Sequence, residues 1–188
     1  VVANCLPDFP PKDAWLEKNR ADGFDFRAAE GDVADFNSCT AMVKKIESEI
    51  GPIDVLVNNA GITRDTLAMR LKDEDWDAVL DTNLKAVFRM SRAVMRTMMK
   101  QRYGRIVNIT SGSMAGYANQ AAYAASKGGL WSLTRTLATE GVPLGIKANA
   151  VNPGAFTRMV AATLQADSPL LEYSRDNLPP ELSSPAVA

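Results

Sequence analysis

Residues 51–61 read Gly-Pro-Ile-Asp-Val-Leu-Val-Asn-Asn-Ala-Gly, and this stretch decides the fold class. The run from Ile53 to Val57 is nearly continuous in apolar residues and does not alternate with polar ones. Such strands are typical of parallel sheets that are covered on both faces. The run stops at a polar, small-residue turn, Asn58-Asn59-Ala60-Gly61. We therefore expect a buried parallel strand that ends in an asparagine- and glycine-containing loop.

The segments on either side repeat an order of strand and helix. Asp35 is a candidate N-cap for a helix whose apolar residues recur at helical spacing until Gly51-Pro52. The remaining expected elements are helices over 13–21, about 84–98 and 121–140, strands over 1–3, 24–29, 105–110 and 147–151, and two short helices beyond 154. This alternation predicts an α/β fold with a doubly wound parallel sheet, whose ligands bind beyond the C-terminal strand ends.

Composition narrows the function classes. The 188 residues are 46% hydrophobic, which fits one soluble domain, and 21 basic against 22 acidic residues leave no broad positive field for nucleic acid or an anionic membrane. No apolar run approaches the ~18 residues of a membrane span, and no leader is evident. Cys5 and Cys39 form no Cys-x-x-Cys pattern, so we expect a reducing, cytoplasmic location. The absence of histidine excludes Ser-His-Asp hydrolysis and histidine-based metal sites, and we expect no metal.

Tyr123-x-x-x-Lys127 is the strongest candidate for acid–base chemistry. Its four-residue spacing in an expected helix puts phenol and ammonium on one face, about one turn apart. An ammonium ~4 Å from the phenol at an effective dielectric of ~20 favours phenolate by about 4 kcal/mol. That energy corresponds to roughly three pKa units, so we expect Tyr123 to titrate near neutrality. Ser111 ends the preceding strand twelve residues upstream, where its hydroxyl can bind the same carbonyl oxygen.

These residues occur in an order that resembles the short-chain dehydrogenase/reductase family across the whole chain. The matching features are Asn58-Asn59-Ala60-Gly61, Asn83 in a segment that interrupts a helical stretch, Ser111, and Tyr123-x-x-x-Lys127. The resemblance implies a Rossmann fold and hydride transfer with a nicotinamide cofactor. It implies that Tyr123 is the acid/base, Lys127 lowers its pKa and holds the nicotinamide ribose, Ser111 positions the carbonyl, and Asn83 anchors a proton-relay water.

The resemblance also implies a set of cofactor-binding residues. They are Asp32 and Val33 at the adenine, Asn58, Ala60 and Gly61 at the centre, Tyr123 and Lys127 at the ribose, and Pro153, Gly154 and Thr157 at the carboxamide. Cys5 stands where enzymes that use NAD place an acidic residue. We therefore expect NADPH, with NAD as the alternative.

The chain departs from the family pattern in three places. The Gly-rich turn, with its strand and helix, is absent from this sequence, and the last residues end at Pro-Pro-Glu-Leu before the family's last strand. We therefore expect residues 1–188 to form a single Rossmann-type domain, incomplete at both ends. The serine-to-tyrosine spacing is twelve rather than the commoner thirteen, which leaves Ser113 as a stand-in for Ser111.

Different segments are similar to different groups within the family. Residues 1–65 resemble acetoacetyl-CoA reductases, and residues 67–110 resemble 3-oxoacyl-[acyl-carrier-protein] reductases. The segment from Lys147 onward resembles hydroxyacyl-CoA dehydrogenases. The expected reaction is NADPH-dependent reduction of a 3-oxoacyl thioester, with Gln120 and Phe156 on the substrate side. Arg102 matches a carrier-docking arginine, but Leu144 replaces the second one, which favours CoA.

Two alternatives remain open at this point. One is an NAD-dependent 3-hydroxyacyl-CoA or secondary-alcohol dehydrogenase, which would share the same catalytic residues. The other is a non-catalytic fragment of such an enzyme. The resemblance further implies a homo-oligomer, a tetramer in this family, that acts on a small-molecule acyl thioester.

Overall fold

The computed structural model describes residues 1–154. The two short helices expected beyond residue 154, together with Phe156 and Thr157, lie outside the described residues. No helix in the described part of the chain combines the length and the apolar content needed to cross a membrane.

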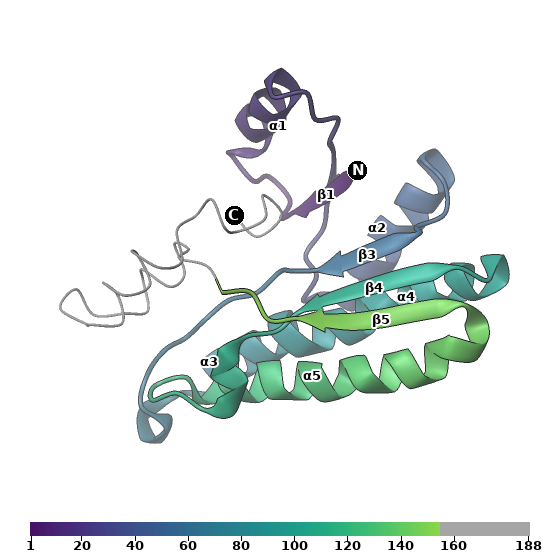
Figure 1. The fold of residues 1–188 in the computed structure, drawn as a ribbon. Helices are drawn as coiled ribbons and strands as arrows, with labels where there is room; N and C mark the ends of the chain where they lie inside the picture. The colour runs from purple at the N-terminus through teal and green to yellow at the C-terminus, as the bar shows by residue number, and fades with distance from the viewer. Residues whose placement is uncertain (155–188) are drawn as a thin grey trace.

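Strands and helices alternate along the chain as the sequence predicts (Figure 1). In order they are β1 (Val2–Cys5), α1 (Lys12–Ala21), β2 (Arg27–Glu30), α2 (Phe36–Glu49), β3 (Val55–Asn58), η1 (Ala68–Arg70), α3 (Asp73–Leu80), η2 (Asp81–Lys85), α4 (Ala86–Gln101), β4 (Gly104–Ile109), η3 (Gly112–Ala115), α5 (Ala121–Gly141), η4 (Val142–Leu144) and β5 (Ile146–Val151). The expected N-cap is confirmed, because the Asp35 carboxylate accepts a 2.6 Å hydrogen bond from the backbone N–H of Ser38. Helix α3 is the one longer element that we did not predict.

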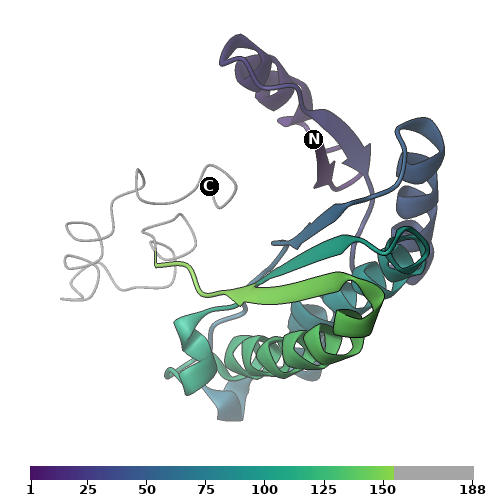
Figure 2. The same cartoon turned by 45° about the vertical axis from the view of Figure 1, so that its right-hand side comes forward.

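The strands are all parallel, which confirms the predicted α/β class, but they form two sheets. Strand β1 pairs with β2, and β3, β4 and β5 pair in that order (Figure 2). Within residues 1–154 no strand joins β1 to β3, so the expected single sheet is divided between them. In both sheets the chain leaves each strand at the same edge, and this edge carries the candidate site.

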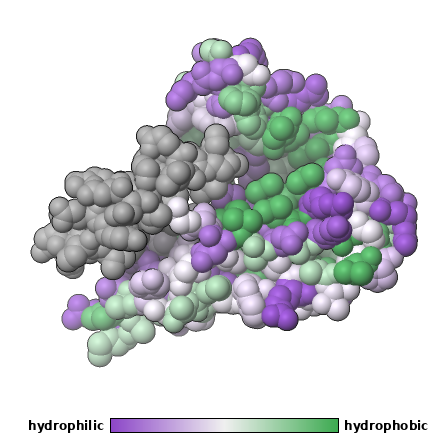
Figure 3. Space-filling view, viewed as in Figure 1, coloured by the Kyte–Doolittle hydropathy of each residue, from purple (hydrophilic) through white to green (hydrophobic). Residues whose placement is uncertain are grey.

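The larger sheet is covered by helices on one face. Along β4 the side chains of Ile106 and Asn108 are buried against α4 and α5, whereas the intervening residues are only half-buried. On the opposite face Val55 and Val57 are about half exposed, at 52% and 49%, and Figure 3 shows hydrophobic surface there. Within the described residues α2, α4 and α5 all pack on the same side of this sheet, which leaves the valines of β3 half exposed on the other.

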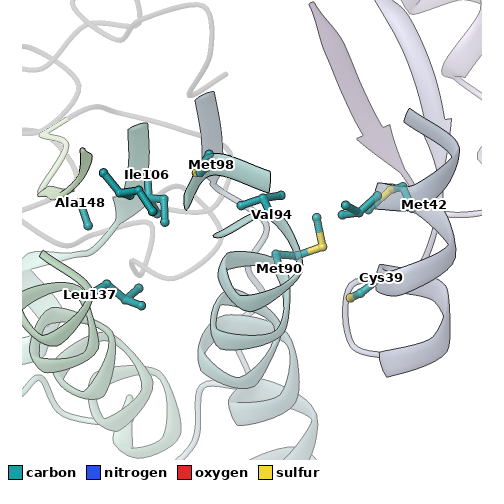
Figure 4. Packing of buried hydrophobic residues seen from close by; sticks show 10 residues of the cluster. Cys39, Met42, Met90, Val94, Met98, Ile106, Leu137 and Ala148 are labelled. Carbon is teal, nitrogen blue, oxygen red and sulfur yellow. The ribbon is translucent and has the colours of Figure 1, made fainter. Parts of the chain in front are cut away.

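The core lies between these helices and the larger sheet. Met90, Val94 and Met98 line one side of α4 and contact sheet residues as well as Cys39 and Met42 of α2 (Figure 4). Cys39 is a core residue and is 1% exposed. Methionine fills such irregular space well because its side chain is unbranched. This core fixes α4 and α5 against the strands from which the candidate site projects.

Candidate active site

Helix α5 brings Tyr123 and Lys127 to one face, as their spacing predicts. Tyr123 is half-buried and Lys127 is only 4% exposed. The Lys127 ammonium donates a 2.7 Å hydrogen bond to the backbone carbonyl of Ile109, the last residue of β4, and lies 5.5 Å from the centre of the Tyr123 ring. The long lysine side chain therefore links the first half of α5 to the end of the neighbouring strand.

The pKa values of this pair differ from the sequence-based expectation. Burial raises the pKa of Tyr123, an interaction with the Ser111 hydroxyl lowers it, and the negative charge of Asp65 raises it further. The Lys127 ammonium, 5.5 Å from the centre of the ring, donates its hydrogen bond to the Ile109 carbonyl. Burial lowers the pKa of Lys127 itself to about 8. The expected lowering of the Tyr123 pKa is thus wrong in this structure, and desolvation is the physical reason.

Ser111 follows β4 directly and stands at the start of the η3 turn. Its hydroxyl accepts a hydrogen bond from the backbone N–H of Ser113 at 3.2 Å and lies 3.1 Å from the Ser113 hydroxyl. The effect of Ser111 on the pKa of Tyr123 places its hydroxyl beside the phenol. Of the two serines considered from the sequence, Ser111 is the one whose hydroxyl interacts with the Tyr123 phenol, and Ser113 contacts Ser111.

Asn83 lies in a short π-helical turn, η2, at the point where the sequence interrupts its helical pattern. Wider turns of this kind often occur at functional sites. The fully buried Asn83 amide accepts from the backbone N–H of Ile62 at 2.8 Å and donates to the Ile62 carbonyl at 2.9 Å. It also lies 3.3 Å from Ser126, whose hydroxyl donates to the Tyr123 carbonyl at 2.7 Å. Asn83 therefore ties the loop after Gly61 to the turn of α5 that carries Tyr123.

The candidate cofactor residues all follow C-terminal strand ends. Asp32 and Val33 come after β2, where an Asp32 carboxylate oxygen accepts from the backbone N–H of Ala34 at 2.8 Å. Asn58 closes β3, with Ala60 exposed and Gly61 half-buried in the loop that follows. Pro153 and Gly154 come after β5, while Thr157 lies outside the described residues. The described candidates thus share the edge of the sheets that carries Tyr123, Lys127 and Ser111.

Gln120 and Asp65 form a contact that the sequence did not reveal. The Gln120 side-chain amide donates to the Asp65 carboxylate at 3.3 Å, and the backbone N–H of Thr66 donates to the Asn119 carbonyl at 2.8 Å. Gln120 precedes α5 directly, so Asp65 reaches the Tyr123 region from a loop more than fifty residues away. No local pattern marks Asp65, because its role depends on that distant approach.

Neutralising Asp65 tests its influence on Tyr123. Because the Asp65 charge raises the pKa of Tyr123, Asp65→Asn lowers that pKa while keeping an oxygen that accepts from Gln120. A phenol that donates a proton stops working once it ionises, so the alkaline limb of the pH–rate profile for carbonyl reduction moves to lower pH. Asp54→Asn, at the opposite end of β3, is the control. A limb that stays where it is in wild type, or moves to higher pH, contradicts this assignment.

Known proteins share both the sequence and the geometry. The family model described as short chain dehydrogenase matches residues 1–168. This chain belongs to the short-chain dehydrogenase family. The membership confirms the resemblance drawn from the site motifs and identifies the chain as an NAD(P)-dependent short-chain oxidoreductase.

Curated relatives of this family cover most of the chain. Nodulation protein G of Azospirillum brasilense is 48% identical over 164 residues, which are 86% of this chain and 67% of the relative. Acetoacetyl-CoA reductase of Cupriavidus necator is 45% identical over 88% of this chain and 68% of its own length. The Escherichia coli 3-oxoacyl-[acyl-carrier-protein] reductase FabG is 49% identical over 72% of this chain and 56% of its own length.

A solved structure supports the fold independently. A gluconate 5-dehydrogenase from Burkholderia cenocepacia J2315, in complex with NADP and tartrate, superposes with a TM-score of 0.82 at 32% identity. The match covers 92% of this chain and 67% of that one. The chain therefore spans between about half and two thirds of the length of these short-chain dehydrogenases, and it has their fold over that span.

Proposed function

We propose that this short-chain dehydrogenase reduces a 3-oxoacyl thioester to the 3-hydroxyacyl thioester with NADPH. The observation that carries the proposal is the cluster of Tyr123, Ser111 and Lys127 at the C-terminal end of β4. Two of the relatives are named as reductases of acetoacetyl-CoA and of 3-oxoacyl groups on a carrier protein. The shared reacting group of these two substrates is a 3-oxo carbonyl.

The proton chemistry of the site suits the reducing direction. Burial raises the pKa of Tyr123, so its phenol is protonated at neutral pH and can donate that proton to the carbonyl oxygen as it becomes an alcohol. The Ser111 hydroxyl beside the phenol donates a hydrogen bond to the same oxygen. Lys127 holds α5 against β4 through the Ile109 carbonyl, which fixes the position of the phenol.

A nicotinamide cofactor fits the described edge of the sheets. When bound, it supplies the hydride that reaches the carbonyl carbon. Lys127 would hold the ribose, Asn58, Ala60 and Gly61 would line the central part, and Asp32 and Val33 would contact the adenine.

Two features of the first strand end support NADPH over NADH. Cys5, the last residue of β1, supplies no carboxylate to accept the ribose hydroxyls. Its partner across the ladder, Glu30, is held by Lys12 at 2.6 Å, which neutralises that carboxylate. NAD remains the alternative cofactor, in an oxidising 3-hydroxyacyl-CoA or secondary-alcohol dehydrogenase.

We propose that Gln120 contacts the acyl group, because it immediately precedes α5 and lies three residues before Tyr123. Phe156, the second residue proposed on the substrate side, lies outside the described residues. We favour CoA over a carrier protein as the thioester, since Arg102 has no second arginine at Leu144.

The experiment follows NADPH consumption with acetoacetyl-CoA, and repeats it with a 3-oxoacyl carrier protein and with NADH. We expect turnover with acetoacetyl-CoA and NADPH above that of the other three combinations. NADPH that binds, as seen by calorimetry, without thioester turnover would refute the substrate class. Oxidation of a 3-hydroxyacyl-CoA or a secondary alcohol with NAD, without thioester reduction by NADPH, would move the assignment to the alternative dehydrogenase. Failure to bind either dinucleotide would mean a non-catalytic fragment.

We also propose a cytoplasmic homo-oligomer, a tetramer. Phe88 on α4 and Trp131 on α5 are 44% and 42% exposed, and aromatic side chains of this kind are enriched at protein interfaces. Light scattering coupled to size-exclusion chromatography measures the assembly directly, and a monomeric mass contradicts it.

A further inference from the structure

A chain of buried hydrogen bonds runs beneath the candidate active site and joins three elements. The Asn58 amide of β3 donates to the side-chain oxygen of Asn108 in β4 at 2.9 Å. The Asn108 amide donates to the Thr134 hydroxyl of α5 at 2.8 Å, and that hydroxyl donates to the Leu130 carbonyl at 2.7 Å. Ser91 of α4 lies at the side of this chain, 3.4 Å from the Asn58 amide.

All members except the half-buried Asn58 are buried, and each has a fixed direction. Asn108 and Ser91 are fully buried, and Thr134 is 3% exposed. Because the Thr134 proton goes to Leu130, its oxygen is left to accept from Asn108, whose own oxygen accepts from Asn58. Turning over either asparagine amide would place two donors or two acceptors face to face. The chain therefore has one self-consistent arrangement, unlike an apolar contact, which has no preferred direction.

This chain and Lys127 attach α5 to the same strand at two points. Asn108 immediately precedes Ile109, whose carbonyl accepts from Lys127. Thr134 follows Lys127 by seven residues, about 10 Å along the helix axis, and lies on the same face as Tyr123 and Lys127. A shift of α5 by one residue along its axis would rotate this face away from β4 by about 100° and break both attachments.

We propose that Asn108 and Thr134 are positioning residues, which fix the axial position of α5 and thereby align Tyr123 and Lys127 with Ser111 at the end of β4. Neither side chain touches the reacting atoms. They act through the helix, because Thr134 holds α5 two turns beyond Lys127 while Asn108 holds the strand three residues before Ser111. This inference rests on the proposed roles of Tyr123 and Lys127.

Thr134→Val tests the proposal, because valine keeps the shape of threonine and removes the acceptor. Thr139→Val is the matched control, since Thr139 lies on the exposed side of α5 and also donates to a carbonyl four residues back, at 3.0 Å. Thr134→Ser keeps the hydroxyl and should behave as wild type. If valine at position 134 prevents folding, the double variant Asn108→Leu with Thr134→Val is used instead. It removes the donor and the acceptor of the Asn108–Thr134 hydrogen bond together, so neither of these two positions keeps a polar group without its partner.

Two readouts separate positioning from mere stability. The first is kcat for 3-oxoacyl thioester reduction, which we expect to fall about tenfold in Thr134→Val while KM for NADPH stays within about twofold. The second readout is the pKa of Lys127, which requires no turnover. Mass spectrometry measures it through the pH dependence of Lys127 acetylation. That pKa is lowered to about 8 by burial, and we expect it to rise toward its ordinary value when α5 is free to shift.

The outcomes distinguish this inference from the proposed function. A wild-type chain that turns over no thioester refutes the proposed function, whereas the acetylation readout still tests the positioning of Lys127. A folded Thr134→Val or double variant whose Lys127 pKa equals that of wild type overturns the positioning role. If the wild-type enzyme is active, a kcat of Thr134→Val that equals the kcat of Thr139→Val also overturns the positioning role.

Discussion

Replacing Tyr123 with phenylalanine should lower kcat for carbonyl reduction by about 10³-fold, within the 10²–10⁴ range that general acid catalysis contributes. The ring packing is preserved, and the lost atom is the phenol oxygen that would donate the proton. Because burial raises the pKa of this phenol, the wild-type residue is protonated at neutral pH and can donate its proton. The measurement is steady-state NADPH consumption at saturating substrate, with calorimetry to follow dinucleotide affinity.

Tyr103→Phe is the matched control for this variant. Tyr103 lies before β4, at the end of the strand opposite to Ser111, and its ring is 43% exposed beneath the Arg105 guanidinium. We expect it to retain wild-type kcat. If Tyr123→Phe keeps more than about a tenth of wild-type kcat, Tyr123 is not the general acid, and the assignment of the site fails.

Replacing Lys127 with methionine should have opposite effects on activity and stability. We expect kcat to fall by about 10²-fold or more, because the variant loses the cation proposed to hold the ribose. At pH 7 the free energy of unfolding should rise by about 1 to 3 kcal/mol. The upper value follows from a pKa of about 8 against an ordinary 10.5, at about 1.36 kcal/mol per pKa unit. The lost hydrogen bond to Ile109 reduces that gain.

The sign of this stability effect is fixed by proton linkage. The unfolded chain keeps the Lys127 proton up to about pH 10.5, whereas the folded chain releases it near pH 8. Wild-type stability therefore rises with pH between these values, and the advantage of Lys127→Met shrinks over the same window. Urea unfolding at several pH values measures this difference in the free energy of unfolding between Lys127→Met and wild type. Lys147→Met, at an exposed position of β5, should change stability by less than about 0.5 kcal/mol. A Lys127→Met chain less stable than wild type at pH 7 contradicts the pKa assignment.

Local spacing was sufficient to predict much of this protein. The unalternating run before Asn58 and the helical periodicities predicted parallel α/β architecture, and Asp35 was identified as an N-cap. The four-residue spacing placed Tyr123 and Lys127 on one helix face. The interruption around Asn83 marked the segment that forms a π-helical turn. Each of these depends on a few adjacent residues, whose backbone geometry is set by short-range sterics and hydrogen bonding.

The direction of the Tyr123 pKa could not be obtained in this way. It depends on desolvation by the segments that pack around the phenol, which outweighs the interaction with Ser111. The influence of Asp65 is likewise invisible in the sequence, because it arises where a distant loop meets the start of α5. Even so, one signal was present: Asn108 is a polar residue inside an apolar strand, and a buried amide requires partners.

The sequence by itself determined the family, the alternation of strands and helices and the identity of the residues at the strand ends. Only the tertiary structure decided the division of the strands into two sheets, the single covered face of the larger one, and the hydrogen bonds that join Asn58, Asn108 and Thr134. The physical reason is range. Periodicity and spacing act within about one helical turn or one strand, whereas burial, charge and hydrogen-bond partners at this site come from residues that lie tens of positions apart.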